Sequence, residues 1–287
     1  MSNLVEELVN LLNLETIELN LFRGESRDVG GRSVFGGQVL AQALMASLHT
    51  MTEKRHCHSL HAYFLRPGDV QTPIVYEVDR IRDGGSFTTR RVIAIQQGEA
   101  IFNMSASFQV VERGLEHQAS TAPDVPPPDQ LESDYEIRLR AAEQLPVRLR
   151  PALTQRRPID IRPVDPVDFI NPEPKAPRRQ VWFRADGKLG NDPGVHQAIL
   201  TYASDFGLLG TGMMQHGLSF ANPNVQAASL DHTLWFHHPF RADEWLLYDM
   251  ESPCAMNARA FNRGQIYQNG KLVASVCQEG LMRVRKP

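Results

Sequence analysis

The sequence predicts an α+β protein built from two units in tandem, each a curled antiparallel sheet wrapped round a long central helix. Two observations predict this fold. An apolar helical segment is followed by strand-like segments joined by short turns, and the same pattern then recurs further along the chain. Residues 57–109 align without a gap on residues 229–281, an offset of 172 residues. Identical pairs include Phe64 and Phe236, Pro67 and Pro239, Tyr76 and Tyr248, Arg91 and Arg263, and Gly98 and Gly270.

Composition limits the class of protein. The 287 residues are 42% hydrophobic, which is enough for one large domain or two smaller ones with their own cores. A net charge of -3 gives no basic surface, so nucleic acid is not an expected partner. The chain lacks an apolar run of transmembrane length and a recognisable signal peptide, and its three cysteines form no C-x-x-C pair. We therefore expect a reduced cytoplasmic protein without membrane insertion.

Two helices are expected in the N-terminal part. Leucines at helical spacing over residues 2–13, with Ser2 as a possible cap, predict a short amphipathic helix. A second helix is expected from Gly36-Gly37 to about His49. It is apolar on nearly every side, so we expect other elements to surround it.

Strands follow this buried helix at once. Alternating apolar and polar residues predict antiparallel strands over 58–66, 74–82, 87–96 and 100–111. Turns are expected at residues 83–85 and at Gln97-Gly98. The sheet formed by these strands is the expected partner of the helix.

Most of the 19 prolines lie in residues 113–178, which we interpret as a connector with one helix near 133–144. The predicted units are therefore residues 1–112 and 179–287. In the second, Asn269-Gly270 predicts a hairpin turn where the first unit has Gln97-Gly98. A helix is expected over 193–205, and strands over 180–185, 227–237, 244–252, 255–268 and 271–283.

Motifs of several enzyme classes are missing from the sequence. It has no Gly-x-Ser-x-Gly, no phosphate-binding glycine loop and no dinucleotide fingerprint. His56, His58 and His61 are close together but lack a convergent further ligand, so neither a metal nor a cofactor is expected. Two explanations remain open for Arg90-Arg91 and Arg263: exposed strand arginines, or arginines that grip a phosphate.

Three polar residues stand inside otherwise apolar segments. Asp205 closes the apolar helix, Ser229 begins a strand, and Gln278 interrupts the last strand. At the 172-residue offset, Cys57 and Ala106 stand where the second unit has Ser229 and Gln278. A carboxylate, a hydroxyl and a carboxamide that converge could hold and deprotonate a water. Helix capping and ordinary strand polarity are the alternative explanations.

At these residues the chain resembles the acyl-CoA thioesterase II family, the double hot dog thioesterases, over essentially its whole length. Five strings carry the resemblance: Val34-Phe-Gly-Gly-Gln38, His58-Ser-Leu-His-Ala-Tyr-Phe-Leu-Arg-Pro-Gly-Asp69, Tyr202-Ala-Ser-Asp205, Leu230-Asp-His-Thr-Leu-Trp-Phe-His237 and Val276-Cys-Gln-Glu-Gly280.

The resemblance implies a single catalytic trio of Asp, Thr and Gln that orients the water attacking the thioester. Asp205 and Gln278 match the motif, whereas Ser229 stands at the Thr position and keeps only the hydroxyl. The backbone amides of Gly36 and Gly37 are the expected oxyanion donors, because they open a helix. The resemblance also implies an acyl-CoA substrate, its acyl chain in an apolar slot and its phosphates near basic side chains, and a homodimer or homotetramer.

Two other functions remain open at this point. A hot dog hydratase or dehydratase would use a histidine–carboxylate pair, for which His58 and His61 are the obvious donors. A non-catalytic acyl-CoA sensor is the second alternative. The polar trio argues against the sensor, because binding alone does not require a carboxylate in an apolar setting.

Overall fold

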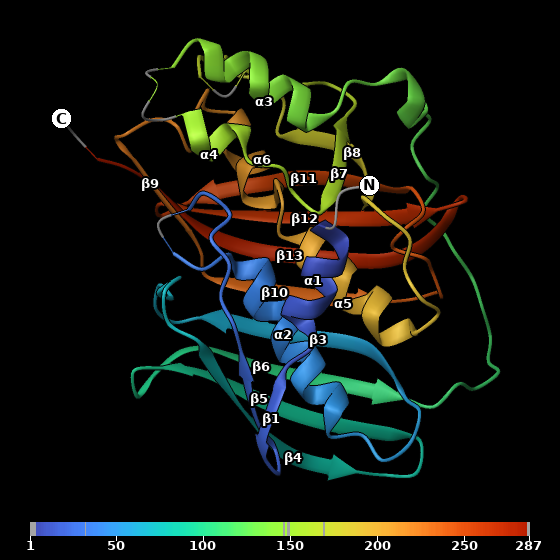
Figure 1. Cartoon of the computed structure of the whole chain (residues 1–287). Coiled ribbons are helices and arrows are strands. Elements are labelled where there is room, and N and C mark those ends of the chain that lie inside the picture. The colour runs from blue at the N-terminus through green and yellow to red at the C-terminus, as the bar shows by residue number, and fades with distance from the viewer. Residues whose placement is uncertain (1–3, 32, 146, 148–149, 169, 286–287) are drawn as a thin grey trace.

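A single antiparallel sheet runs through the whole molecule in the computed structural model, and helices lie against it (Figure 1). The structure describes residues 4–31, 33–145, 147, 150–168 and 170–285, so Ser2, the expected helix cap, lies outside the described residues. Within the described residues, the strand order is β1-β2-β4-β5-β6-β3-β10-β13-β12-β11-β8-β7, and β9 pairs with β13.

The first unit contains one long helix and six strands among its described residues. Its elements are α1 (Leu4–Leu12), β1 (Glu15–Glu18), β2 (Leu21–Gly24), α2 (Gly36–His49), β3 (His56–Phe64), β4 (Ile74–Asp83), β5 (Phe87–Gln96) and β6 (Glu99–Gln109). The predicted strands and the apolar helix are all present. The helix is buried on nearly every side, as expected.

The second unit follows a connector that has some regular structure of its own. The connector carries η1 (Pro128–Gln130), α3 (Asp134–Glu143), α4 (Arg150–Thr154) and β7 (Ile159–Pro163). The second unit carries β8 (Arg178–Ala185), α5 (Pro193–Ser204), α6 (Leu208–Met214), β9 (Val225–Ser229), β10 (Asp231–Phe236), β11 (Leu246–Met256), β12 (Arg259–Gln268) and β13 (Lys271–Val284). Since β7 pairs with β8, part of the connector extends the second unit's sheet.

The 172-residue offset holds in the strand register. His61 pairs with Ser105 in the first unit, and Thr233 pairs with Cys277 at the same places in the second. The two units meet where β3 and β10 run antiparallel, and there His61 lies opposite Thr233. Equivalent positions therefore face each other at the junction, so the two units are related by an approximate twofold axis.

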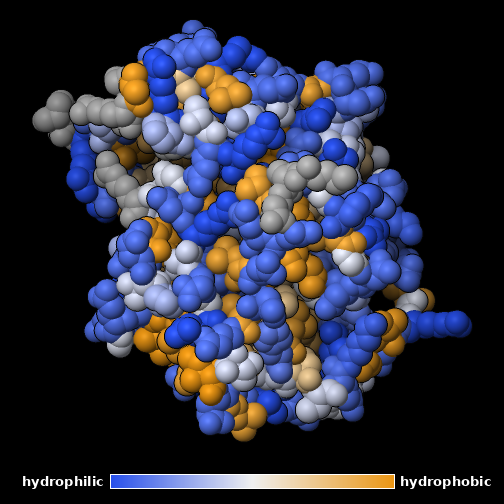
Figure 2. Space-filling view, viewed as in Figure 1, coloured by the Kyte–Doolittle hydropathy of each residue, from blue (hydrophilic) through white to orange (hydrophobic). Residues whose placement is uncertain are grey.

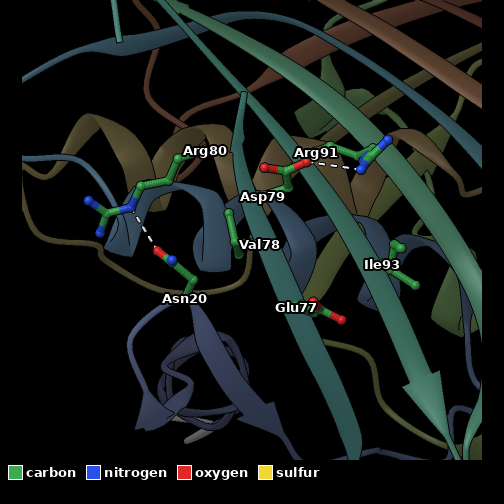
Figure 3. Close-up of a pocket in the computed structure, with 7 residues that line it drawn as sticks. All are labelled: Asn20, Glu77, Val78, Asp79, Arg80, Arg91 and Ile93. Atoms are coloured by element: carbon green, nitrogen blue, oxygen red, sulfur yellow. Dashed lines mark hydrogen bonds and ion pairs between the residues drawn. The ribbon is translucent and has the colours of Figure 1, made fainter. Parts of the chain in front are cut away.

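Polar contacts repeat at the same offset. Arg91 bonds to Asp79 at 2.9 Å (Figure 3), and in the second unit Arg263 bonds to Glu251 at 2.6 Å. Arg90 bonds to Asp83 at 2.6 Å, so all three arginines considered from the sequence are paired with a carboxylate.

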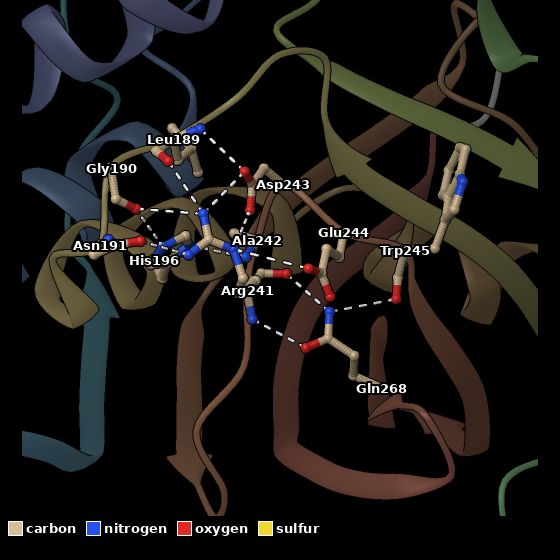
Figure 4. Close-up of polar contacts among 10 residues, drawn as sticks. All are labelled: Leu189, Gly190, Asn191, His196, Arg241, Ala242, Asp243, Glu244, Trp245 and Gln268. Atoms are coloured by element: carbon tan, nitrogen blue, oxygen red, sulfur yellow. Dashed lines mark hydrogen bonds and ion pairs between the residues drawn. The ribbon is translucent and has the colours of Figure 1, made fainter.

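A glutamine holds the loop before a strand in each unit in the same way. Gln96 Nε2 donates to Asp69 O at 2.9 Å, and Gln268 Nε2 donates to Arg241 O at 2.8 Å (Figure 4). Gln96 and Gln268 are identical at the 172-residue offset, so the repeat includes this side-chain hydrogen bond as well as the strand register.

The long helices of the two units pack against each other at the centre of the molecule (Figure 1). Helix α2 also lies against β4, β5 and β6, whereas α6 covers β11, β12 and β13. A Cβ on Gly37 would lie 2.4 Å from the Tyr202 carbonyl oxygen, so this close helix contact requires glycine. Figure 2 shows hydrophilic side chains over most of the visible face, including α3, and hydrophobic ones near its centre over α1 and α2.

Some elements were not predicted. The short β1, β2, α4, α6 and β7 were missed, because fewer than eight residues carry too little periodicity. The predicted break between the strands at 244–252 and 255–268 was wrong. β11 continues past Pro253 through a register shift between Glu251 and Cys254, where a proline is tolerated, and the chain turns at Asn257-Ala258 with φ of 51° and 57°.

Candidate active site

Asp205 lies where the two long helices meet. It is the C-cap residue of α5, and only 7% of its side chain is exposed. Its Oδ1 accepts a hydrogen bond of 2.7 Å from Gln278 Nε2, and its Oδ2 accepts one of 2.9 Å from the Gly37 amide. The structure therefore brings together three of the predicted site residues, from α5, β13 and α2.

The position of Asp205 is unfavourable for its own helix and favourable for the neighbouring one. The C-terminus of α5 carries partial negative charge, which disfavours a carboxylate there. Helix α2 has no side-chain cap of its own at Phe35, and its N-terminal amides face the carboxylate instead. Asp205 thus caps the first unit's helix from the second unit.

Glycine at the start of α2 makes this contact possible. A Cβ on Gly36 would lie 2.8 Å from Asp205 Oδ2 and 3.0 Å from the ring of Phe64. Among the described residues, no hydrogen bond is made by the Gly36 amide, whereas the Gly37 amide is bound to Asp205. The two predicted oxyanion donors therefore differ in availability.

His232 is a further residue of this site, and sequence reasoning missed it. It is completely buried on β10, with Nδ1 at 3.0 Å from Gln278 Nε2 and Nε2 at 2.9 Å from Ser204 Oγ. Burial lowers the pKa of His232 from 6.5 to about 4, although Asp205 opposes this by favouring the charged form. The imidazole is therefore neutral near pH 7.

The donors and acceptors in this series of hydrogen-bonded side chains can be assigned from the residues at its two ends, Ser204 and Asp205. The Ser204 hydroxyl donates to Thr201 O at 2.9 Å, so it accepts from His232 Nε2–H, which leaves Nδ1 as an acceptor. Gln278 Nε2 can then donate one hydrogen to His232 and the other to Asp205. The opposite amide orientation would place the Gln278 oxygen against a carboxylate, so one orientation is favoured.

This orientation leaves an acceptor without a partner. Gln278 is completely buried, and its Oε1 has no hydrogen-bond partner among the described residues. A buried carbonyl oxygen normally has a partner, so Gln278 Oε1 is suited to accept from a bound water or substrate. The backbone of Gln278 is held independently, since Asn262 Nδ2 donates to its carbonyl oxygen at 3.3 Å.

Ser229 lies near this pair but is not bonded to it. It is the last residue of β9 and pairs with Gly280 on β13. Gln278 is two residues before Gly280 on the same strand, so the side chains of Ser229 and Gln278 lie on the same face of the sheet. Within the described part of the chain, no hydrogen bond joins its hydroxyl to Asp205 or Gln278. The role of Ser229 stays a prediction.

Comparison of the two units at the 172-residue offset could have identified His232 as a site residue. It places Leu60 where the second unit has His232, just as it pairs Ala106 with Gln278. In the first unit Leu60 and Ala106 face each other on β3 and β6, so an apolar pair replaces the polar one. The signal was a third polar substitution in one unit only.

The histidines considered from the sequence lie elsewhere. His58 binds Ser107 at 2.8 Å, and His61 is exposed with its ring against Trp235. In the part of the chain that the structure describes, no cluster of histidine, cysteine and carboxylate side chains is arranged to hold a metal ion. None of the described helices is both long and apolar enough to span a bilayer.

Comparison with known proteins places these features in context. Residues 25–109 match the model of the acyl-CoA thioesterase N-terminal domain, and residues 162–281 match that of the acyl-CoA thioesterase family. Acyl-CoA thioesterase 2 of Haemophilus influenzae is 40% identical over 288 residues, covering 99% of both chains.

Two solved structures are similar over nearly the whole chain. The acyl-CoA thioesterase II TesB2 of Mycobacterium marinum has 44% identity and a TM-score of 0.79, covering 98% of this chain and 99% of the other. A hot dog protein of Alicyclobacillus acidocaldarius has 18% identity and a TM-score of 0.79 with the same coverage, a likeness of fold alone. The predicted double hot dog fold is confirmed.

Proposed function

This chain belongs to the acyl-CoA thioesterase family, and on that premise we propose that it hydrolyses acyl-CoA by direct attack of a water that Asp205, Ser229 and Gln278 orient. The products are a free fatty acid and CoA. The observation that carries the proposal is the 2.7 Å bond between Asp205 and Gln278, whose Oε1 is buried without a partner.

In the proposed reaction, Asp205 acts as the general base. Each of its oxygens accepts one hydrogen bond, so lone pairs remain for a water. The water donates one hydrogen to Asp205 and the other to Gln278 Oε1, and its oxygen attacks the thioester carbon. The tetrahedral intermediate then collapses, the C–S bond breaks, and the thiolate takes the proton from the Asp205 carboxyl.

The Gly36 amide supports an oxyanion role better than Gly37. The Gly37 amide is bound to Asp205, whereas the Gly36 amide has no acceptor among the described residues. Both open α2, where the helix dipole favours negative charge. We assign the charge developing on the thioester oxygen to the Gly36 amide, with the Ser229 hydroxyl as a second polar group on the water.

The hydratase alternative loses its expected donors. His61 is exposed and His58 is bound to Ser107. His232 is near Asp205, at 3.9 Å, but both of its nitrogens are occupied by Gln278 and Ser204. It therefore has no nitrogen free to exchange a proton with a substrate.

Thiol release from a panel of acyl-CoAs tests this proposal. The Asp205→Asn variant keeps an acceptor for the Gly37 amide but lacks the base, so kcat should fall roughly 100- to 10,000-fold. His61→Ala is the matched control and should retain wild-type kcat. Its side chain is exposed, on the face of the sheet opposite to that of His232. Full activity of Asp205→Asn would exclude the mechanism, and tight binding without thiol release would favour the sensor.

Three further expectations accompany the proposal. The chain should form a homodimer or homotetramer, which light scattering after size-exclusion chromatography measures. It should be cytoplasmic, which fractionation of its source cells would test. Limited proteolysis should cut first within residues 113–178, if that segment connects units at 1–112 and 179–287.

A further inference from the structure

Three arginines form a group next to the loop that follows Asp205. They come from different elements: Arg138 from α3, Arg157 from the segment between α4 and β7, and Arg179 from β8. Arg157 approaches Phe206 and Arg179 approaches Gly207, the two residues that link α5 to α6, whereas Arg138 lies close to Arg157. Positive charge is thus concentrated beside the candidate active site.

A single carboxylate serves this group. Asp134 Oδ2 is 2.7 Å from Arg138 Nε and 3.6 Å from Arg157 Nη1. Arg138 also donates to the carbonyl oxygens of Leu153 and Gln155, so its hydrogen bonds hold the connector together. Its charge is therefore offset within the fold, whereas that of Arg157 is offset only in part.

Arg157 lies over an aromatic cluster at the site. Its guanidinium carbon is 5.2 Å from the centre of the Phe206 ring, which stacks on Phe35 at 4.5 Å. One quarter of its side chain, 25%, is exposed, so its free edge remains accessible. Phe35 precedes the α2 amides that face Asp205, which links Arg157 to the site through two rings.

Arg179 has no carboxylate partner among the described residues. Its Nε is buried without a hydrogen-bond acceptor, and a Cβ on Gly207 would lie 3.1 Å from its Nη1. Burial lowers the pKa of both Arg157 and Arg179, and repulsion from Arg138 and Arg179 lowers that of Arg157 further, whereas Asp134 opposes the shift at both arginines. A cation held in this way costs folding free energy, which an anionic ligand would offset.

We infer that Arg157 and Arg179 bind the phosphate groups of CoA, at the entrance to the site that contains Asp205. The inference rests on the proposed function. Guanidinium groups bind phosphate oxygens in pairs of hydrogen bonds, which makes arginine suitable here. In CoA the pantetheine arm separates the thioester from the nearest phosphate, so the phosphate site should lie apart from the catalytic carboxylate.

Arg90 and Arg91, which the sequence also offered as phosphate-binding arginines, are unsuitable for this role. The recess lined by Asn20, Glu77, Asp79, Arg80 and Arg91 contains as many acidic as basic side chains, and Arg91 is bonded to Asp79 (Figure 3). Arg90 is buried and bonded to Thr50 and Asp83. Neither arginine has the unbalanced charge of Arg157 and Arg179.

Comparison of two substrates with the same acyl group tests the inference. One is the acyl-CoA that the wild type hydrolyses best, and the other is its N-acetylcysteamine thioester, which has no phosphate. For Arg157→Gln and Arg179→Gln, kcat/KM for the CoA thioester should fall roughly ten- to hundredfold, mainly through KM. The value for the N-acetylcysteamine thioester should not change. Arg91→Gln removes the same charge from the recess in Figure 3 and should leave both values unchanged.

Thermal unfolding separates a binding role from a structural one. Without ligand, Arg179→Gln should unfold at the same temperature as the wild type or higher, because a half-buried charge whose Nε has no acceptor is lost. Free CoA should raise the unfolding temperature of the wild type more than that of either variant.

Equal losses on both substrates, or no loss on either, would overturn the inference. If the wild type releases no thiol from any acyl-CoA, the proposed function fails. The CoA-dependent rise in unfolding temperature would still decide whether these arginines bind CoA.

Discussion

His232 should make the stability of the protein depend on pH between about 4 and 6.5. In the unfolded chain a histidine binds a proton near pH 6.5, whereas burial lowers the pKa of His232 in the folded protein to about 4. Between these values only the unfolded state carries the proton, so acid favours unfolding. Above pH 6.5 both states are neutral at this residue, and the effect is absent.

The size of the effect follows from the same two values. The interval from 6.5 to about 4 covers about 2.5 pH units, and each unit corresponds to about 1.36 kcal/mol. His232 alone should therefore remove about 3 kcal/mol from the free energy of unfolding as the pH falls through this range. That is a large fraction of the total for a typical domain.

Urea unfolding at pH 7.5 and pH 4.5 measures this loss. His232→Asn is the informative variant, because Asn can accept from Gln278 and does not titrate. It should be less stable at pH 7.5, since the bond to Ser204 is lost, but should lose less stability on acidification than the wild type. All other residues are the same in the two proteins, so their contributions cancel in the comparison, and exposed His61→Gln is the control. An equal loss in wild type and His232→Asn would refute the reasoning.

Substitutions at two further positions, Ser229 and Gly37, test the site and its packing. Ser229→Ala should lower kcat about tenfold without changing the unfolding temperature, whereas Ser229→Thr should retain activity, because only the hydroxyl is required. Thiol release measures both variants. Equal activity of the two would remove Ser229 from the mechanism. Gly37→Ala should destabilise the protein by about 1–3 kcal/mol, because the new Cβ would lie 2.4 Å from the Tyr202 oxygen. Gly85→Ala, where nothing lies within 4 Å, is its control in thermal unfolding, and similar stability of the two variants would contradict the packing argument.

The sequence alone determined most of the regular structure. Strand alternation predicted the central strands of both units, and Phe87–Gln96 begins and ends as expected. The hairpin turns followed from Gln97-Gly98 and Asn269-Gly270, whose positive φ angles match this type of turn. These features depend on neighbouring residues, which is why a local pattern identifies them.

The repeat at an offset of 172 residues gave information about residues that are distant in sequence, which local patterns do not give. It indicated that Ser229 and Gln278 break the symmetry, and the registers of β3, β6, β10 and β13 preserve that offset. The family resemblance then assigned roles to Asp205 and Gln278, which the structure brings within 2.7 Å of each other.

Only the tertiary structure decided how the site is assembled. Gly37, Asp205 and Gln278 are far apart in sequence, and no local pattern shows that one helix caps another through a carboxylate. The orientation of the Gln278 amide depends on His232, which it contacts because β10 pairs with β13, and on Ser204 at the end of α5, which bonds to His232. The unbalanced charge of Arg157 and Arg179 is likewise visible only after folding, because it depends on which carboxylates come close and which do not.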